Sequence, residues 1–299
     1  MIFPENESDF LCITSLTPTV CDLCNVRRPA QCGAEPIKAV IEAAEKELNG
    51  GKIEKMLIFA PDAVGIQLWE KYPEEQRKVE SLAPIRVPVK SVMPSVTPVN
   101  FGSMYSGALP EVHGIREYAK PVLTCETIFN VFPEAGKKTA ICAVNGCSID
   151  TIFRRRPVTY ISTLSDADAL TFTETILNNC SFNTGIKGFE GFDQEFSEDI
   201  LNNRSFDFIL CYATDYDSVM HHTQPFAPEA ITAFKTDVQS FQRLVALTDK
   251  VWKGYNRLVV WSPDHGSHLN PATNHGTHGA DIPEDTLVYH FYRIKAAEK

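Results

Sequence analysis

Five short apolar runs recur along the chain, and segments with helical periodicity separate most of them. The runs lie in KIEKMLIFAPDAVG, IRVPVKSVMP, KKTAICAVNG, FDFILCYATD and NRLVVWSPDHG. A continuous apolar run is typical of a strand buried on both faces, because helices cover both sides of a parallel sheet. Strands that alternate with helices therefore predict an α/β fold with a doubly wound, mostly parallel sheet sandwiched by helices.

Two regions depart from this alternation. Within residues 1–50, an irregular stretch with four cysteines, CITSLTPTVCDLCNVRRPAQC, precedes a helical segment that stops at Gly-Gly. We expect residues 1–50 to form an irregular and helical segment that packs on a main domain of residues 51–299. Residues 154–204, rich in Asn, Ser, Gly and Phe, are expected to form a small cap insertion at one end of the sheet.

The charge of the chain limits its partners. The formal net charge is -10 and the sequence pI is about 5.3, which argues against nonspecific binding to nucleic acid or anionic membrane. The first ten residues, MIFPENESDF, lack a basic segment followed by an apolar run, and no apolar stretch approaches the roughly 20 residues of a membrane span. We expect a cytoplasmic protein whose nine cysteines are reduced thiols.

Acidic residues follow three of the predicted strands. Asp62 comes after MLIFAP, Asp217 after FILCYATDY, and Asp264 with His265 after LVVWSP. Ligands of open α/β sheets bind just beyond the carboxyl ends of the strands. We therefore expect these side chains to meet at one edge of the sheet.

Two further histidines extend this set. His221 lies four residues after Asp217, a spacing that puts both side chains on one side of a helical turn, and His278 lies in the Gly-rich loop HGTHGAD. Six carboxylate and imidazole groups exceed the four ligands of one tetrahedral ion, so we predict two divalent ions, zinc with manganese as the alternative. A metal pair about 3.5 to 4 Å apart can clamp the attacking and departing oxygens of a phosphoryl group.

Thr97 is the candidate nucleophile for such a reaction. It lies in PSVTPVNFGSMYSGALPEVHGI, at the start of a predicted helix that follows an apolar run. Coordination to a divalent cation lowers the pKa of a threonine hydroxyl and makes its alkoxide accessible. The helix start is expected to direct backbone N–H groups at an anion, and the amide of Asn100 is expected to join them.

These residues resemble the alkaline phosphatase superfamily, and most closely its type I phosphodiesterase/nucleotide pyrophosphatase branch. The branch carries Pro-x-x-Thr-x-x-Asn followed by Pro-Glu-x-His-Gly-Ile, and YATDYDSVMHHTQP, WSPDHG and GTHG then follow in the order of its remaining metal motifs. The similarity covers roughly residues 53–281. It implies that Asn100 stabilises a developing oxyanion. It also implies two metal sites, one held by Asp217, His221 and His278 and the other by Asp62, Asp264, His265 and Thr97.

Several positions depart from the pattern of the branch. Ala63, Tyr216, Met220 and Gln224 replace family residues, and Pro263 splits the usual Ser-Asp pair. None of these changes removes a ligand. They alter the rim of the expected site, so the preferred substrate stays open.

The remaining histidines and the arginine run have simpler interpretations. His268 and His275 match no ligand position and are expected in the loop or as partners that orient ligands. We expect His113 to be a hydrogen-bonding partner at a helix end and His222 to be an exposed neighbour. The arginines at 154–156 favour a solvated face over a grip on substrate phosphate.

The cysteines divide into two groups. The spacing of the first group fits neither a standard zinc ribbon nor a thioredoxin motif, so its role stays open between metal or redox chemistry and simple packing. The second group is expected to be buried as small apolar side chains. The first group is Cys12, Cys21, Cys24 and Cys32, and the second is Cys125, Cys142, Cys147, Cys180 and Cys211.

The resemblance predicts a metal-dependent hydrolase of phosphodiester or pyrophosphate bonds that acts on a small phosphorylated substrate, with nucleotides among the candidates. Thr97 would attack phosphorus, and water would then release the phospho-threonine intermediate. Monoesterases of the superfamily add an arginine soon after the nucleophile, whereas Pro98 and Val99 follow here. Aromatic residues in 182–196 are expected either to shape the leaving-group pocket or to belong to the core.

Three alternatives remain. A phosphonate hydrolase of the phosphonoacetate type shares the threonine motif but usually shows Gly-Asn after His-Gly-Ile, and HGIREY lacks it. A phosphomonoesterase or phosphomutase of the same superfamily is the second, although a phosphomutase usually carries a larger cap. From another class altogether, the chain could be a zinc-binding interaction protein that docks through its N-terminal cysteines.

Overall fold

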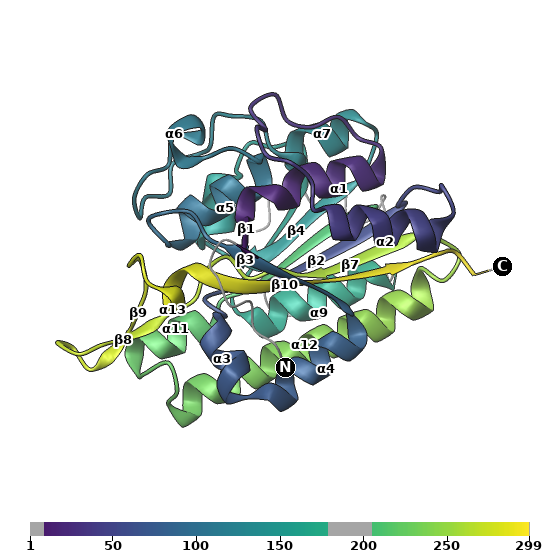
Figure 1. Ribbon diagram of the computed structural model, residues 1–299. Coiled ribbons are helices and arrows are strands. Elements are labelled where there is room, and N and C mark those ends of the chain that lie inside the picture. The colour runs from purple at the N-terminus through teal and green to yellow at the C-terminus, as the bar shows by residue number, and fades with distance from the viewer. Residues whose placement is uncertain (1–8, 179–204, 299) are drawn as a thin grey trace.

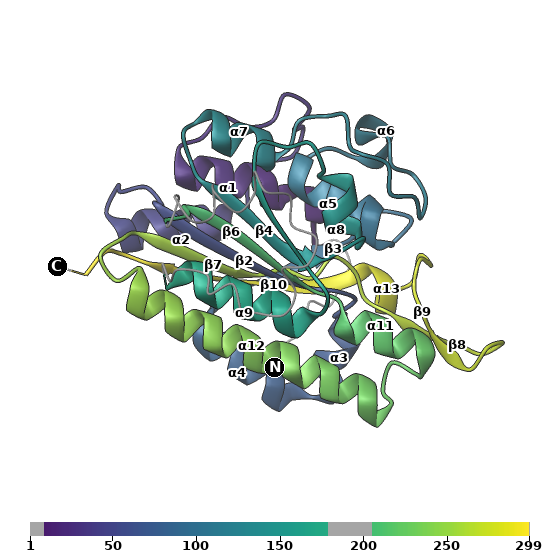
Figure 2. The same ribbon diagram turned by 180° about the vertical axis from the view of Figure 1, so that it is seen from behind.

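The computed structural model describes residues 9–178 and 205–298, and its centre is one large sheet. Eight strands of the described residues form this sheet, which helices cover on both faces (Figures 1 and 2). In spatial order the strands are β1 (Leu11–Cys12), β3 (Ile85–Lys90), β10 (Leu287–Lys295), β7 (Arg257–Trp261), β2 (Lys55–Pro61), β6 (Phe208–Ala213), β4 (Thr139–Val144) and β5 (Thr159–Thr163).

Strand β10 is the antiparallel member of the sheet. It pairs antiparallel with β3 and with β7, whereas β1–β3, β7–β2, β2–β6, β6–β4 and β4–β5 are parallel pairs. Strands β2, β3, β4, β6 and β7 are the five predicted runs, so the expectation of a mostly parallel α/β sheet is confirmed. Because β3, β7, β2 and β6 all run in the same direction, their carboxyl ends meet at one edge.

Successive side chains of the central strands enter two separate cores. In β2, Met56 and Ile58 point into one core, and Leu57 and Phe59 into the other. This alternation follows from the two-residue period of a strand, and it explains why the run is apolar at every position. The first core also takes residues from α1, α2, α5, α7 and α8, and the second from α3, α4, α9, α11 and α12.

The helices that build these two layers have the following bounds. On the first face lie α1 (Leu16–Cys24), α2 (Lys38–Leu48), α5 (Thr97–Ser106), α6 (Pro110–His113), α7 (Ile128–Glu134) and α8 (Ser148–Ile152). On the second face or at the site edge lie α3 (Ile66–Lys71), α4 (Pro73–Leu82), α9 (Asp166–Leu177), α11 (Asp215–His222), α12 (Pro228–Val251) and α13 (Pro283–Thr286).

The N-terminal segment is more regular than its sequence suggested. The cysteine stretch was expected to be irregular, but its first part contains a 3-10 turn, η2 (Ile13–Ser15), followed by helix α1. Residues 25–32 form no helix or strand, as expected. Pro18 lies in the first turn of α1, where a missing N–H breaks no helical hydrogen bond, and the helix ends at Asn25 in the left-handed conformation. Strand β1 joins this segment to the edge of the main sheet beside β3.

The described part of the expected cap insertion belongs to the main fold. Strand β5 is the outer strand beside β4, and helix α9 packs its buried face into the second core. Residues 159–177 therefore extend the sheet and its helix layer instead of capping them. Residues 179–204, with the aromatic segment at 182–196 and Cys180, lie outside the described residues, so the cap stays a prediction for them.

A small hairpin projects from the site edge of the molecule. Strands β8 (His268–Asn270) and β9 (His275–Thr277) pair with each other in antiparallel fashion, and β9 lies beside α11 (Figure 1). Gly276 permits this contact, because a Cβ there would lie 2.6 Å from the carbonyl oxygen of Met220. None of the helices that the structure describes is both long and apolar enough to span a bilayer.

Candidate active site

The predicted ligands gather at the carboxyl edge of the sheet. Asp62 directly follows β2, Asp264 and His265 lie three and four residues after β7, and Thr97 is the first residue of α5, which follows β3. Ala63, next to Asp62, has a φ of 61°, a conformation in which glycine carries less strain. This backbone angle gives a physical reason for the Asp-Gly of the family pattern.

Asp62, Asp264 and His265 form what we call the buried triad. Each offers a ligand atom within 4.8 Å of the others, and their side chains are at most 4% exposed. Nε2 of His265 lies 3.5 Å from Oδ1 of Asp62 and 3.3 Å from Oδ2 of Asp264. The hydroxyl of Thr97 lies 3.2 Å from the same Nε2. These four residues are the set that the resemblance assigned to one metal.

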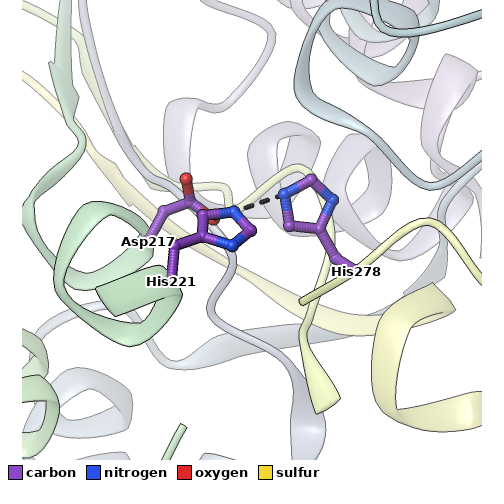
Figure 3. A group of neighbouring side chains, drawn as sticks. All are labelled: Asp217, His221 and His278. Atoms are coloured by element: carbon purple, nitrogen blue, oxygen red, sulfur yellow. Dashed lines mark ion pairs between the residues drawn. The ribbon is translucent and has the colours of Figure 1, made fainter. Parts of the chain in front are cut away.

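Asp217, His221 and His278 form the open triad (Figure 3). Helix α11 carries Asp217 and His221, and the loop after β9 carries His278. Oδ1 of Asp217 lies 3.3 Å from Nε2 of His221 and 3.5 Å from Nε2 of His278. The His221 side chain is 36% exposed, so solvent reaches this triad. These are the three residues that the resemblance assigned to the other metal.

Hydrogen bonds fix how the three imidazoles face the carboxylates. Nδ1 of His221, His265 and His278 lies 2.9 to 3.1 Å from the carbonyl oxygens of Gly276, Gly266 and Ser95, respectively. A carbonyl accepts only, so each Nδ1 carries a proton, and each Nε2 is left facing a carboxylate. Imidazole Nε2 atoms and carboxylate oxygens that converge in this way are the ligand atoms that divalent ions take in proteins.

The carboxylate oxygens support the same interpretation. Oδ1 of Asp62, Oδ1 of Asp217 and Oδ2 of Asp264 are buried and have no hydrogen-bond partner among the described residues. These are the oxygens that lie nearest the Nε2 atoms of the histidines. Buried charged oxygens without partners are costly, and cation binding is the usual way in which proteins satisfy them. Both triads therefore fit divalent ions.

The two triads adjoin each other. The ring centroids of His265 and His278 are 4.1 Å apart, and those of His221 and His278 are 4.9 Å apart. Two ions held by these groups would therefore be neighbours, as a reaction on one phosphoryl group requires.

Electrostatics at the buried triad favour a cation strongly. Burial, reinforced by the nearby Asp217, raises the pKa of Asp264 to about 8, and burial with Asp264 raises the pKa of Asp62 well above its ordinary value. Burial, with His265 beside it, lowers the pKa of His278 to about 3, so His278 is neutral at physiological pH. Crowded carboxylates and a neutral imidazole are the groups that a divalent ion stabilises.

The amide of Asn100 is engaged with the backbone, and its predicted role at an oxyanion stays a prediction. Its Oδ1 accepts the Val92 N–H at 2.8 Å, and its Nδ2 donates to the carbonyls of Val92 and Val96 at 3.3 Å, so its amide braces the turn before α5. The first turn of α5 also offers an anion fewer free backbone N–H groups than expected. Pro98 has no N–H, and the N–H groups of Val99 and Asn100 bond to the Val96 carbonyl.

The other histidines play supporting parts. His268 donates through Nδ1 to Oδ1 of the buried Asp285 at 2.7 Å, and Asp285 also accepts the Ala280 N–H from the loop after His278. His113 is buried against Ser103 at the end of α6, as predicted. The exposed His222 bonds to the Ser218 carbonyl on its own helix, and the exposed His275 lies on β9.

Arg154 and Arg155 are exposed, as expected for a solvated face, and Arg156 is partly buried. Arg154 forms an ion pair with Asp150 at 2.6 Å, and Arg156 donates to the carbonyls of Leu123 and Cys125. The described cysteines are all free thiols. Cys21, Cys24, Cys125, Cys142 and Cys211 are buried, Cys32 and Cys147 are partly exposed, and Cys12 is exposed. No cysteine belongs to a potential metal-binding group in the part of the chain that the structure describes.

Three residues near the ligands were not identified from sequence. The Tyr212 hydroxyl donates to Oδ2 of Asp62, the Ser91 hydroxyl donates to the Asp264 carbonyl at 2.6 Å, and Nε2 of His290 donates to the Pro263 carbonyl at 2.9 Å. Tyr212 is the first residue of the metal motif YATDYDSVMHHTQP, so its position in the sequence could have identified it. Nothing local marks the other two, because Ser91, just after β3, and His290, on β10, are remote in sequence from the residues that they support.

Comparison with known families gives one match. The family described as type I phosphodiesterase / nucleotide pyrophosphatase matches residues 56–294, which include every proposed ligand. No curated protein shows a significant sequence match to the chain.

Solved structures share the fold at low identity. Human ectonucleotide pyrophosphatase / phosphodiesterase 5 is 16% identical, with a TM-score of 0.51 over 72% of this chain and 57% of its own. The murine counterpart, an inactive threonine-to-alanine variant in complex with AMP, is 15% identical, with a TM-score of 0.52 over 74% and 59%. A Bacteroides thetaiotaomicron protein of glycosaminoglycan metabolism is 10% identical, with a TM-score of 0.54 over 81% and 67%. The chain thus spans less than three fifths of the ectonucleotide relatives, and its fold is alkaline phosphatase-like.

Proposed function

The chain belongs to the type I phosphodiesterase / nucleotide pyrophosphatase family, and from this membership and the site geometry we propose that it is a two-metal hydrolase of phosphodiester or pyrophosphate bonds. The observation that carries the proposal is the convergence of three unpartnered carboxylate oxygens and three imidazole Nε2 atoms beside the Thr97 hydroxyl. Zinc is the proposed ion, because carboxylate and imidazole ligands suit it.

Each triad would hold one metal ion. The buried triad with Thr97 would hold one ion and the open triad the other. Bound divalent ions would supply Lewis acidity, lower the pKa of the threonine hydroxyl and neutralise charge on the phosphoryl oxygens.

The chain's own residues would position the reaction. Thr97 would attack phosphorus in line, form a phospho-threonine and release the leaving group, and water would then free the threonine. The Thr97 residue is 3% exposed, and its hydroxyl lies 3.2 Å from Nε2 of His265, within reach of an ion held by the buried triad. The positive end of α5 adds a favourable field for the anion. An inactive threonine-to-alanine variant of the murine relative supports the same role for Thr97.

The proposed substrate is a small phosphodiester or pyrophosphate compound, with nucleotides as the first candidates, because the murine relative is described in complex with AMP. A phosphodiester carries one negative charge fewer than a monoester, so it does not require an arginine beside the nucleophile. We find no basic residue in the first turn of α5. We further propose that the protein acts in the cytoplasm.

The test combines a nucleophile variant with two substrates. Purified zinc-loaded protein is assayed with bis-p-nitrophenyl phosphate and p-nitrophenyl phosphate, and Thr97→Ala is compared at matched zinc content. We expect a preference for the diester, and loss of about 10³-fold or more of kcat in Thr97→Ala with two zinc ions retained. A large monoester preference would overturn the diester assignment, and an unchanged rate in Thr97→Ala would overturn the nucleophile.

A further inference from the structure

A second cavity opens on the face of the sheet that α9 and α12 cover. It encloses about 240 Å³, and its walls come from α9, α12, the start of α11 and the ends of β2 and β6. Helix α5, which carries Thr97, lies on the opposite face (Figure 2). None of the six triad ligands lines the cavity, although Tyr212, which donates to Asp62, does. No step of the proposed hydrolysis uses the cavity.

Three carboxylates line this cavity, and one of them has no partner. Asp166 is satisfied, because it accepts the backbone N–H groups of Thr214 and Asp215 at the start of α11. Asp237 differs. It is 4% exposed on the sheet-facing side of α12, and its Oδ2 has no hydrogen-bond partner among the described residues. A buried carboxylate with an unsatisfied oxygen is the kind of group that a bound ligand completes.

None of the described residues supplies the missing positive charge. Among the described residues that line the cavity, Arg243 is the basic one, and its guanidinium already pairs with Glu174 at 2.9 Å. The cavity therefore carries an excess of negative charge from Asp166, Asp215 and Asp237, because the guanidinium of Arg243 is already paired with Glu174. Burial, followed by the repulsion of Asp166 and Asp215, raises the pKa of Asp237 well above its ordinary value. A ligand of positive charge would relieve this repulsion.

The geometry argues against a directly bound metal ion at this place. Among the described residues, the two triads of the active site are the groups whose ligand atoms all lie within 4.8 Å of one another. The three carboxylates of the cavity form no such group. Apolar side chains also line the cavity, among them Phe59, Leu170 and Ala213. A ligand with a charged group at one end and an aliphatic chain would contact both the acidic and the apolar residues of the cavity.

We propose that the cavity between α9 and α12 is a binding site for a small organic cation, a primary ammonium group on a short aliphatic chain, with Asp237 as its principal anionic contact. The ammonium donates to the buried carboxylate, and the chain packs on Phe59 and Leu170. Because none of the triad ligands lines the cavity, binding does not compete with phosphate.

The test measures binding of n-butylamine to the zinc-loaded full chain by calorimetry, with 1-butanol as the neutral isostere. We expect one site for the amine, no measurable binding of the alcohol, and amine affinity unchanged by saturating inorganic phosphate. Asp237→Asn is expected to weaken the amine at least about tenfold, because it removes a charge-assisted hydrogen bond. Glu229→Gln, the same change at an exposed position of α12, should leave the affinity unchanged.

A second variant keeps the test decisive if Asp237→Asn does not fold. Thr171→Trp fills the cavity from an exposed position of α9 and should abolish amine binding. Equal binding of amine and alcohol, binding that phosphate displaces, or full affinity in both Asp237→Asn and Thr171→Trp would overturn the proposal. No amine binding, or binding of Mg²⁺ in its place, would overturn it as well. None of these outcomes bears on the rate of phosphodiester hydrolysis, so the proposed function is tested separately.

Discussion

The buried triad and the open triad contain the same kinds of ligand but differ in burial and origin. The buried triad takes Asp62 and Asp264 from the ends of two neighbouring strands, and its side chains are at most 4% exposed. The open triad takes Asp217 and His221 from one turn of α11, and its side chains are 7 to 36% exposed. In the proposed two-metal enzyme, water could replace a lost ligand in the open triad, whereas the buried triad would need its ion to neutralise packed carboxylates. From this difference we predict a tightly held ion in the buried triad and an exchangeable one in the open triad.

The largest expected effect comes from removing one carboxylate from each triad. Asp264→Asn should lower kcat/KM about 10³-fold, because no water reaches the buried position. Asp217→Asn should cost about ten times less, since solvent can fill the vacant coordination position. Steady-state rates at saturating zinc, with zinc content measured for each variant, check this order.

Asp281→Asn serves as the control for this pair. Asp281 is an exposed carboxylate, 69% accessible, shortly after His278, and it belongs to neither triad. Its substitution should leave kcat/KM within a factor of about two. Equal losses in Asp264→Asn and Asp217→Asn would contradict the proposed difference between the triads.

The next effect concerns the rate of metal loss. During chelation by EDTA, the open triad should release its ion first, because His221 is the most exposed ligand of the six. We expect an intermediate with one zinc ion per chain and two phases that differ about tenfold or more in rate. Zinc released over time, measured by mass spectrometry, shows either these phases or a single one. A single phase would mean that the sites are equivalent or fully coupled.

The third effect concerns stability as a function of pH. In the metal-free fold the pKa of Asp264 is about 8, above its ordinary 3.8, so the folded state binds more protons than the unfolded state between these values. The free energy of unfolding should therefore fall as pH rises, by up to about 1.4 kcal/mol per pH unit. His278 has the opposite effect only below its ordinary pKa of 6.5, which leaves pH 6.5 to about 8 as the clear window.

Urea unfolding across that window measures the effect. The metal-free protein should lose stability between pH 6.5 and about 8, and zinc should remove most of the loss, because bound ligands stay deprotonated. The metal-free Asp264→Asn variant should show a flatter profile. A metal-free protein that gains stability with pH would refute the raised pKa.

The smallest expected effect comes from Tyr212→Phe. The hydroxyl of Tyr212 donates to Asp62, so its loss should loosen the buried triad and lower kcat/KM about tenfold. Tyr105→Phe is the matched control, because the buried Tyr105 hydroxyl has no hydrogen-bond partner among the described residues. Tyr105→Phe should leave the rate unchanged. Equal effects of the two variants would remove Tyr212 from the support of the ligands.

Much of the fold and of the ligand set could be predicted from the sequence. The five apolar runs identified β2, β3, β4, β6 and β7, because strands buried on both faces need apolar residues at every position. The runs of β5 and β10 were missed. β10 reads LVYHFYRIK, and polar residues there find partners inside the fold, such as Arg293 with Asp249 at 2.5 Å. Helix α1 was missed because threonine and proline gave its sequence a loop-like composition.

The sequence motif did not indicate how the Asn100 side chain is held, and its role at an oxyanion stays a prediction. A motif names a side chain but not its direction, and this amide completes three backbone hydrogen bonds of the turn before α5. The backbone N–H and C=O groups of that turn lie within a few residues of Asn100, and they bond to its amide in place of a ligand. The support of the Pro263 carbonyl by His290 was equally invisible, because the two are 27 positions apart on different elements.

The sequence by itself determined the strand order in the chain, the residues at the strand ends and the types of ligand, because these depend on local pattern and on residue chemistry. Only the tertiary structure decided which triad is buried, how its carboxylate oxygens are left without partners, and that an unpartnered Asp237 lines a cavity on the other face. Burial and partnership depend on the packing of segments remote in sequence, and no local pattern encodes the distances that the packed sheet imposes.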